Sequence, residues 1–324
     1  MSPANLLFVP EELSAYQWRP ARREDIPAVY VMRAAGVAVD RPHTPPSEER
    51  LGHLFGLLGE HLEQNTLLAL AEDDAVAAAA FVFFPPPEDA HLALVDGHVH
   101  VRLRGRGLGS YLLSWLEARA RQEFSGGEDS LPQLLRTSCA AHQSDRIALF
   151  EQHGFQAARY SYTMQRGLVE PVPEIPLPPG MDLQSWSPAL DPAVMRAFTA
   201  AFQGQWGMPG MTPDLWRDFF TGVPQFRPEL SCLALAGGEV VGFCINWVVD
   251  NNAWVEALGV LPDWRGRGLA SALLSHSLVL FQAAGFTRAA LDVDAENPTG
   301  ALRLYQKLGF VAVKEEIHYL KQLT

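Results

Sequence analysis

Two stretches of the chain share one pattern of apolar and polar positions. Residues 68–83 read LALAEDDAVAAAAFVF, and residues 233–248 read LALAGGEVVGFCINWV. In each stretch an apolar run is followed by a polar or glycine-containing turn and then by a second apolar run, which is typical of a β-hairpin. The pattern therefore predicts two hairpins, one in each half of the chain.

The elements after each hairpin are also repeated. AWVEALGV at 253–260 is typical of a buried strand, and a loop at 265–270 leads into an apolar-periodic helix that ends near Gly285. The loop region WRGRGLASALL at 264–274 recurs as LRGRGLGSYLL at 103–113, and LYQKLGF at 304–310 recurs as LFEQHGF at 149–155. Because the order of the elements is preserved, the chain is a tandem repeat, with an extra loop expected at 125–132.

A proline-rich segment lies between the two copies. Residues 170–180 read EPVPEIPLPPG, and prolines lack backbone donors and favour an extended connector. We therefore expect an N-terminal domain at 1–169, a linker at 170–180 and a C-terminal domain at 181–324. A length of 324 residues suits two domains, and each half has the mixed order of helices and strands of an α/β fold.

Composition and charge narrow the class of protein. With 48% hydrophobic and 19% charged residues, the chain is expected to fold. A net charge of -12 and a pI near 5.3 argue against a nucleic-acid partner. The three cysteines form no CxxC pair, and no stretch is typical of a signal peptide or a membrane span. We expect a soluble cytoplasmic protein without nucleic-acid or membrane partners, and the sequence leaves its oligomeric state open.

The repeated arginine-glycine loop is typical of an anion site. Glycines let backbone N–H groups approach an anion, the helix N-terminus adds partial positive charge, and the arginines add full charges. The loops contain neither GxGxxG nor GK[ST], so neither a dinucleotide site nor a nucleotide P-loop is indicated. The pattern predicts a cradle for a pyrophosphate.

Both halves resemble the GCN5-related N-acetyltransferase (GNAT) family, whose acetyl-CoA loop has the pattern [QR]xxGx[GA]. Arg265, Gly268 and Ala270 fill this pattern in the second half, and NPTGALRLYQKLGF at 297–310 resembles a later motif of the family. The tandem layout, with AFQGQWGMPGMTPDLW at 201–216, resembles mycothiol-synthase-like double acetyltransferases. The resemblance implies two tandem GNAT domains, each a mixed, mostly antiparallel twisted sheet flanked by helices, with acetyl-CoA as cosubstrate.

The resemblance also implies which residues hold acetyl-CoA. In the second half these are Leu258, Gly259, Val260, Arg265, Gly266, Arg267, Gly268, Leu269, Ala270 and Asn297. In the first half they are Val99, Arg104, Gly105, Arg106, Gly107, Leu108 and Gly109. Asn297, followed by Pro298, is also well placed to cap the next helix.

Transfer of an acetyl group to an amine requires a base and an acid. An alkylamine with a pKa of about 10.4 must lose a proton, and the departing thiolate is best protonated. The resemblance implies that Glu256 is the base, with Asp292 as second candidate, and that Tyr305 protonates the sulfur. Tyr305 is otherwise interpreted as a half-buried core side chain. The acceptor is expected to be a primary amine of a small molecule.

The first half lacks these groups. Counting from the repeated motifs aligns Glu256 with Val95 and Tyr305 with Phe150, and it aligns Asp292 and Asp294 with Thr137 and Cys139. A slip of one residue would instead bring Asp96 to the position of the base. The first half is therefore expected to bind the coenzyme without catalysis. Two alternatives are a non-catalytic CoA-responsive binding module and a chain in which both halves acetylate different amines.

Histidines and aromatic residues supply the remaining candidates. His98 and His100 lie on one face of a strand, but no third ligand at a diagnostic spacing accompanies them, so no metal site is predicted. His98 is also a candidate base in the first half. Trp206, Met208 and Met211 lie in a glycine-broken segment and are candidates for a mobile wall of the acceptor site.

Overall fold

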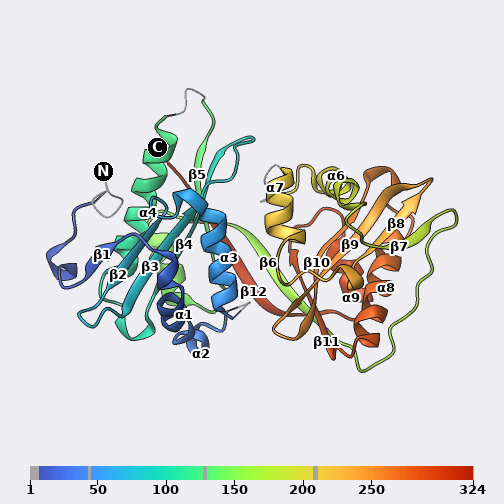
Figure 1. The fold of residues 1–324 in the computed structure, drawn as a ribbon, viewed down its shortest axis with the longest axis horizontal. Coiled ribbons are helices and arrows are strands. Elements are labelled where there is room, and N and C mark those ends of the chain that lie inside the picture. The colour runs from blue at the N-terminus through green and yellow to red at the C-terminus, as the bar shows by residue number, and fades with distance from the viewer. Residues whose placement is uncertain (1–6, 43–44, 127–129, 207–210, 324) are drawn as a thin grey trace. The chain divides into compact units, whose positions relative to one another are not determined.

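The computed structural model describes residues 7–42, 45–126, 130–206 and 211–323 (Figure 1). Contacts divide the chain into an N-terminal unit, Met1–Arg159 with Glu316–Thr324, and a C-terminal unit, Tyr160–Glu315. In the described ranges, no helix has the length and apolar character needed to cross a bilayer.

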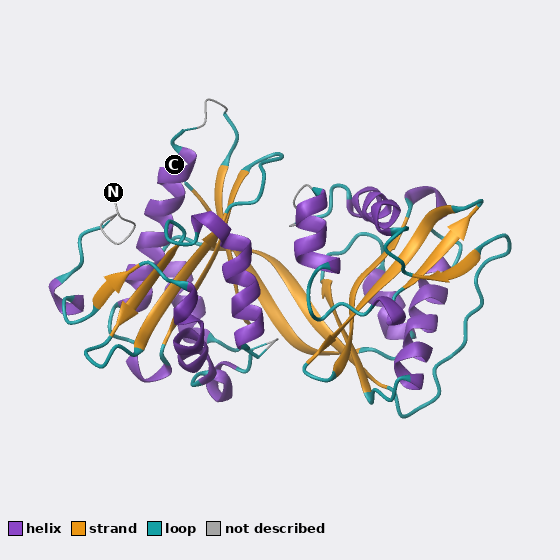
Figure 2. Cartoon of the chain, in the orientation of Figure 1, coloured by secondary structure: helices purple, strands orange, loops and turns teal. Residues whose placement is uncertain are grey.

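The N-terminal unit is a twisted sheet with helices on both faces (Figure 2). Neighbouring strands are antiparallel except β4 and β5, and the hairpin predicted at 68–83 is formed by β2 and β3. One core lies between the sheet and α1 and α3, and the other lies under α4 and α5. In chain order the elements are β1 (Gln17–Arg19), α1 (Ile26–Ala34), α2 (Val37–Asp40), α3 (Glu48–Leu58), β2 (Thr66–Leu70), β3 (Val76–Phe83), β4 (His91–Val99), α4 (Leu108–Phe124), β5 (Gln133–Ala140) and α5 (Ser144–Gln152).

The C-terminal unit repeats this arrangement. Its strands follow the order β6-β11-β10-β9-β8-β7, and in the described part of this unit β10 and β11 are parallel while the other neighbours are antiparallel. α6 and α7 cover one core, and α8 and α9 cover the other. The mixed, mostly antiparallel sheet flanked by helices confirms the predicted fold class. In chain order the elements are β6 (Gln156–Gly167), β7 (Asp182–Ser185), α6 (Asp191–Phe202), α7 (Pro213–Trp216), β8 (Cys232–Ala236), β9 (Glu239–Val249), β10 (Asn252–Val260), α8 (Leu269–Ala283), β11 (Arg288–Asp294), α9 (Ala301–Lys307) and β12 (Val311–Gln322).

The last strand of each half completes the sheet of the other unit. In the C-terminal unit, β6 pairs antiparallel with β11, from Ser161 opposite Asp294 to Gly167 opposite Arg288. In the N-terminal unit, the end of β12 pairs antiparallel with β5. A boundary drawn along the sequence cannot separate the two units, because each contains a strand from the other half.

The segment 170–180, expected to be a linker, lies within the C-terminal unit. Its prolines have no backbone N–H to donate, but their carbonyl oxygens can still accept hydrogen bonds. Ser275 on α8 donates from Oγ to the carbonyl oxygen of Pro173 at 2.5 Å, and Ile175 donates its N–H back to Ser275 Oγ at 3.1 Å. Val172 is buried in the core under α8. The segment is therefore a packed part of the unit rather than a free connector.

A substitution at Tyr319 tests the strand exchange, because Tyr319 lies on β12 in the second half of the chain and its side chain packs in the N-terminal core. Its side chain is 1% exposed, and its ring lies 5.4 Å from that of Phe150. We expect Tyr319→Ala to lower the free energy of unfolding by about 3 kcal/mol, as large-to-small core substitutions do. Hydrogen exchange should show the loss of protection in the N-terminal unit. Val313→Ala, on an exposed part of the same strand, is the matched control.

Candidate functional site

A cavity of about 700 Å³ opens in the C-terminal unit where β10 and β11 separate. The ladder between these strands runs from Ala253 opposite Ala289 to Val255 opposite Leu291, and the cavity lies beyond it. Its lining comes from the end of β10, the start of α8, the end of β11 and α9. The structure brings together there the predicted residues Glu256, Leu258, Gly259, Val260, Arg265, Gly266, Gly268, Leu269, Ala270, Asn297 and Tyr305.

The glycine loop has the geometry of an anion cradle. Gly266 and Gly268 have φ values of 74° and 82°, a left-handed conformation that L side chains rarely adopt. Gly268 is the N-cap of α8, and Gly268, Leu269 and Ala270 all line the cavity. The N–H groups and partial positive charge of the helix start therefore face the open space, and this arrangement fits a pyrophosphate.

The first arginine of each loop has a structural role that the sequence did not reveal. Arg265 donates from Nε to the carbonyl oxygen of Val260 at 3.2 Å and from Nη2 to that of Ala201 at 2.8 Å. Arg104 donates from Nε to the carbonyl oxygen of Val99 at 3.4 Å, and its two Nη atoms bind the carboxylate of Asp40 at 2.7 and 2.6 Å. Each arginine thus ties the strand end to a preceding helix.

The second arginine of the C-terminal loop does not line the cavity. The Cζ atom of Arg267 lies 4.8 Å from the centre of the Trp264 ring, and its Nη2 donates to the carbonyl oxygen of Asp263 at 2.9 Å. The expectation that both arginines add charge to the cradle is therefore not met by this geometry. Backbone groups are its main anion-binding feature.

Glu256 is the extra residue of a β-bulge. Val255 pairs with Asn246 and Ala257 pairs with Ile245, so Glu256 has no opposite residue on β9. Bulges of this kind redirect one side chain, and here it lines the cavity. Burial, together with the nearby charge of Asp292, raises the pKa of Glu256 to about 8, although a hydrogen bond with Trp254 opposes the shift. A carboxyl with this pKa is a stronger base than an ordinary glutamate and is half ionised at about pH 8.

Tyr305 lies on α9 and lines the same cavity. Its side chain is buried, and its ring makes an edge contact with Phe310 at 6.1 Å. Burial, with a further contribution from Cys244, raises the pKa of the phenol, so Tyr305 stays protonated at neutral pH and can donate. One cavity therefore holds a carboxyl that accepts near pH 8 and a phenol that keeps its proton.

Asn297 does not cap a helix, and the prediction that it would is wrong. α9 begins at Ala301, and its N-cap is Gly300 with a φ of 78°. Asn297 Oδ1 instead accepts from the backbone N–H of Thr299 at 2.9 Å and from Thr299 Oγ1 at 2.5 Å. Local side-chain bonds of asparagine favour a turn over a helix start, and this turn forms part of the cavity lining.

The aromatic segment before the second sheet contributes to the cavity on the α6 side. Trp206 lines it together with Phe202 and Gln205, whereas Met211 packs against the core under α6. Met208 lies outside the described residues. Gln205 was not predicted, because a single glutamine in a loop carries no pattern.

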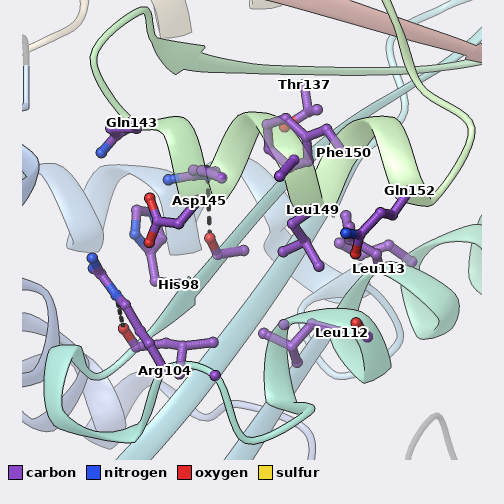
Figure 3. A pocket seen from close by; sticks show the side chains of 18 of the residues that line it. His98, Arg104, Leu112, Leu113, Thr137, Gln143, Asp145, Leu149, Phe150 and Gln152 are labelled. Atoms are coloured by element: carbon purple, nitrogen blue, oxygen red, sulfur yellow. Dashed lines mark hydrogen bonds between the residues drawn. The ribbon is translucent and has the colours of Figure 1, made fainter.

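The N-terminal unit has a cavity of about 380 Å³ at the equivalent place (Figure 3). Its loop glycines Gly105 and Gly107 have φ values of 72° and 85°. Phe150 lines the cavity from α5, in the position that Tyr305 has on α9. The predicted residues Val99, Arg104, Gly105, Gly107 and Gly109 line it, whereas Arg106 is exposed and Leu108 is buried in the core.

The N-terminal unit has no counterpart of the bulged Glu256. Val99 and Val260 accept the same bond from the loop arginine, and counting back from them aligns Asp96 with Ala257. β3 and β4 pair without interruption from Ala78 opposite Val99 to Phe83 opposite Leu94. The suggested slip that would place Asp96 at the base position is therefore wrong.

The two histidines of β4 have different surroundings. His98 lines the N-terminal cavity, and its Nε2 lies 2.9 Å from Asp96 Oδ2. His100 follows the end of the strand, and its Nδ1 accepts from the N–H of Arg102 at 3.3 Å. Among the residues that the structure describes, no three His, Cys, Asp or Glu side chains gather as metal ligands.

Known proteins resemble the chain over most of its length. The mycothiol acetyltransferase of Thermobispora bispora is 30% identical over 315 residues, which cover 87% of this chain and 99% of that relative. That of Streptomyces coelicolor is 29% identical over 304 residues, with 91% of each chain covered.

Solved structures of known proteins also resemble the chain over most of its length. A GCN5-related N-acetyltransferase from Sphaerobacter thermophilus has a TM-score of 0.78 and 29% identity, with 97% of each chain covered. A tandem GNAT protein from the clavulanic acid biosynthesis pathway, at 15% identity, has a TM-score of 0.72, with 95% of this chain and 98% of that chain covered. The family model described as "Acetyltransferase (GNAT) family" matches residues 32–155 and again residues 192–310. The chain therefore belongs to the GNAT family and is an N-acetyltransferase whose acetyl donor is acetyl-CoA.

Proposed function

We propose that the C-terminal unit transfers the acetyl group directly to a primary amine of a small molecule, with Glu256 as base and Tyr305 as acid. One observation carries this proposal: both side chains line the cavity that the glycine loop of α8 also lines. The pKa of Glu256, raised to about 8 by burial and Asp292, suits removal of a proton from an amine.

The reaction follows from these positions. Glu256 takes the proton of the entering ammonium, directly or through water, and the free amine attacks the thioester carbon. As the carbon–sulfur bond breaks, Tyr305 donates its proton to the sulfur. Leu258, Gly259 and Val260 would pair with the pantetheine arm through their backbone groups, because the ladder to β11 ends before them.

The N-terminal unit is proposed to hold acetyl-CoA or CoA in its own loop. Its glycines have the same left-handed conformation, and its loop arginine makes the same bond to the strand end. It lacks the bulged glutamate and has Phe150 in place of the tyrosine. The amine chemistry of the C-terminal unit is therefore not expected there.

An acceptor screen tests the proposed function. The purified chain is given acetyl-CoA and a panel of small alkylamines, aminoglycosides, aminosugar thiols and peptide N-termini, and thiol release is measured. We expect turnover with a small amine, and the name of the 30% identical relatives puts aminosugar thiols first. Turnover with peptides alone, or with no amine at all, would contradict the proposal.

Loop substitutions test the two binding sites separately. Gly268→Ala and Gly107→Ala each force a side chain into a left-handed conformation, at a cost of about 1–2 kcal/mol. We expect calorimetry to detect two acetyl-CoA molecules per wild-type chain. Each substitution should weaken one binding event about tenfold and leave the other unchanged.

Gly285→Ala is the matched control for these substitutions. Gly285 has a φ of 84° but lies at the far end of α8, outside the cavity lining. The control should bind two acetyl-CoA molecules like the wild type. A single binding event in the wild-type chain would show that the N-terminal loop holds no coenzyme.

A further inference from the structure

A second group of titratable side chains lies at the N-terminal cavity. Asp96 Oδ2 is 2.9 Å from His98 Nε2 and 3.8 Å from Arg33 Nη1, and Asp96 Oδ1 is 3.4 Å from Arg146 Nη2. His98 itself lines the cavity, and its side chain is 19% exposed. The His98 side chain is thus mostly buried and lies among the residues that line the cavity (Figure 3), whereas the Asp96 side chain is 43% exposed.

The surroundings of Asp96 determine which ring nitrogen of His98 carries the proton. Burial disfavours the charged carboxylate, but His98, Arg33 and Arg146 outweigh it and hold the pKa of Asp96 well below its usual range. An ionised carboxylate can only accept hydrogen bonds. His98 therefore donates from Nε2 to Asp96, and in the neutral ring Nδ1 keeps its lone pair.

The His98 ring is neutral at pH 7. Burial lowers the pKa of His98, and the charges of Arg33 and Arg146 lower it further, while Asp96 opposes them. The other charged groups on this cavity are Asp40, Arg104 and Asp145. Asp40 and Arg104 neutralise each other in a bidentate ion pair.

We propose that the N-terminal unit is a second acyl-transfer centre, in which His98, oriented by Asp96, is the base for weakly basic amines such as arylamines. This inference rests on the proposal that the N-terminal loop holds acetyl-CoA. It replaces the expectation that this unit is non-catalytic and takes up His98, which the sequence offered as a candidate base of the first half.

The proposed step balances without a tyrosine. The amine nitrogen bonds to the thioester carbon, and its proton passes to His98 Nδ1. The carbon–sulfur bond then breaks, and the imidazolium returns the proton to the CoA thiolate, because Phe150 offers none. The products are the amide and CoA thiol, and His98 is neutral again.

The lowered pKa of His98 selects the class of amine. An imidazole with a pKa below about 6.5 is a weaker base towards an alkylammonium, whose pKa is about 10.4, than Glu256 is with a pKa of about 8. The acceptor best suited to His98 is therefore an amine that enters the cavity already free of its extra proton. Arylamines do so at neutral pH, whereas alkylamines are mostly protonated.

The test uses the full-length chain with the C-terminal centre removed by Glu256→Gln and Tyr305→Phe. CoA thiol release from acetyl-CoA is measured with p-anisidine and with tyramine at pH 8, where Glu256 is about half ionised and His98 is neutral. We expect p-anisidine turnover to keep at least half of its wild-type rate, while tyramine turnover falls 100-fold or more. Adding His98→Asn should lower the remaining p-anisidine turnover by about 100-fold, the usual contribution of a general base.

Three further variants separate a catalytic from a structural role. His100→Asn, at the end of the same strand but outside the cavity lining, should leave p-anisidine turnover unchanged. His98→Gln repeats the loss with another side chain, and thermal unfolding checks that both His98 variants fold. Asp96→Asn, a positioning variant, should move the titration midpoint of His98 to lower pH in an NMR titration, because Asp96 supports the charged ring.

Each outcome decides between the two centres. If p-anisidine turnover disappears with Glu256→Gln and Tyr305→Phe, or survives His98→Asn, the N-terminal centre is refuted and the C-terminal proposal stands. If tyramine turnover survives the C-terminal substitutions, the proposed function fails instead. Loss of p-anisidine turnover in His98→Asn and His98→Gln, with normal folding, supports the inference.

Discussion

Glu256→Gln is expected to lower kcat for the amine acceptor by a factor of about 10²–10⁴, the usual contribution of general acid–base catalysis. The amide keeps the size of the carboxyl group but cannot accept a proton from the amine. KM for acetyl-CoA should change little, because the coenzyme is proposed to bind through the backbone of β10 and the loop of α8. Steady-state kinetics with each substrate varied in turn measures both effects.

The pH dependence identifies Glu256 more sharply than the rate does. Burial and Asp292 raise the pKa of Glu256 to about 8, so the base is protonated below that pH. For the wild type, kcat/KM should fall about tenfold per pH unit as the pH drops below 8, after correction for ionisation of the amine. Asp292→Asn removes the second cause of the shift and should move this limb to lower pH.

The free energy of unfolding should fall as the pH rises, whereas kcat/KM should rise. Between about pH 4.5 and 8 the folded chain holds a proton on Glu256 that the unfolded chain has lost, so stability falls as the pH rises through this window. The slope is at most about 1.4 kcal/mol per pH unit. Glu256→Gln should remove this fall, and Tm measured across the window checks it.

Glu239→Gln is the matched control, because Glu239 is exposed at the start of β9 and does not line the cavity. It should leave kcat and the pH profile unchanged. An unchanged pH limb in Glu256→Gln would assign the base to another group.

Tyr305→Phe is expected to lower kcat by about 100-fold and to leave acetyl-CoA binding within about threefold of the wild type. The substitution removes one hydroxyl and keeps the ring that packs on Phe310. Because burial raises the pKa of Tyr305, the wild-type phenol is protonated throughout the working range and should add no pH limb near neutrality. Stopped-flow measurement of thiol release separates this step from coenzyme binding.

Tyr160→Phe serves as control, because Tyr160 is 39% exposed and does not line the cavity. Equal turnover of Tyr305→Phe and the wild type would remove Tyr305 from the mechanism. A loss of coenzyme binding as large as the loss of kcat would indicate that the ring, rather than the proton, was disturbed.

Local patterns in the sequence were sufficient for the repeated elements. The hairpins β2–β3 and β8–β9, the glycine loops and the helices after them depend on neighbouring residues, and the structure has them at the predicted places. The mostly antiparallel sheet came from the family resemblance. Except for Arg267, the residues predicted to surround the loop of α8 line one cavity because they lie on adjacent strands and helix starts.

Features set by distant partners could not be predicted. The bulge at Glu256 depends on its register with β9, and alternation along β10 alone does not show it. Arg104 and Arg265 appeared as free charges, but their partners Asp40 and Ala201 each lie 64 positions earlier. The acceptor at Ala201 is a backbone carbonyl, which every residue has, so the sequence gives no signal for this contact. The exchange of β6 and β12 could not be predicted, because the sequence pattern of each strand indicates only a strand at the end of its half.

The position of β12 affects when the N-terminal unit can complete its sheet during synthesis. β5 lies in the first half, but its partner residues Glu316 to Gln322 leave the ribosome only after most of the second half has been translated. At about 5–20 residues per second, the edge of β5 waits roughly 10–30 s for its partner. An unpaired strand edge is a template for aggregation during this time. The N-terminal unit, although translated first, is completed last, and a premature stop anywhere in the second half leaves the first half unfinished as well.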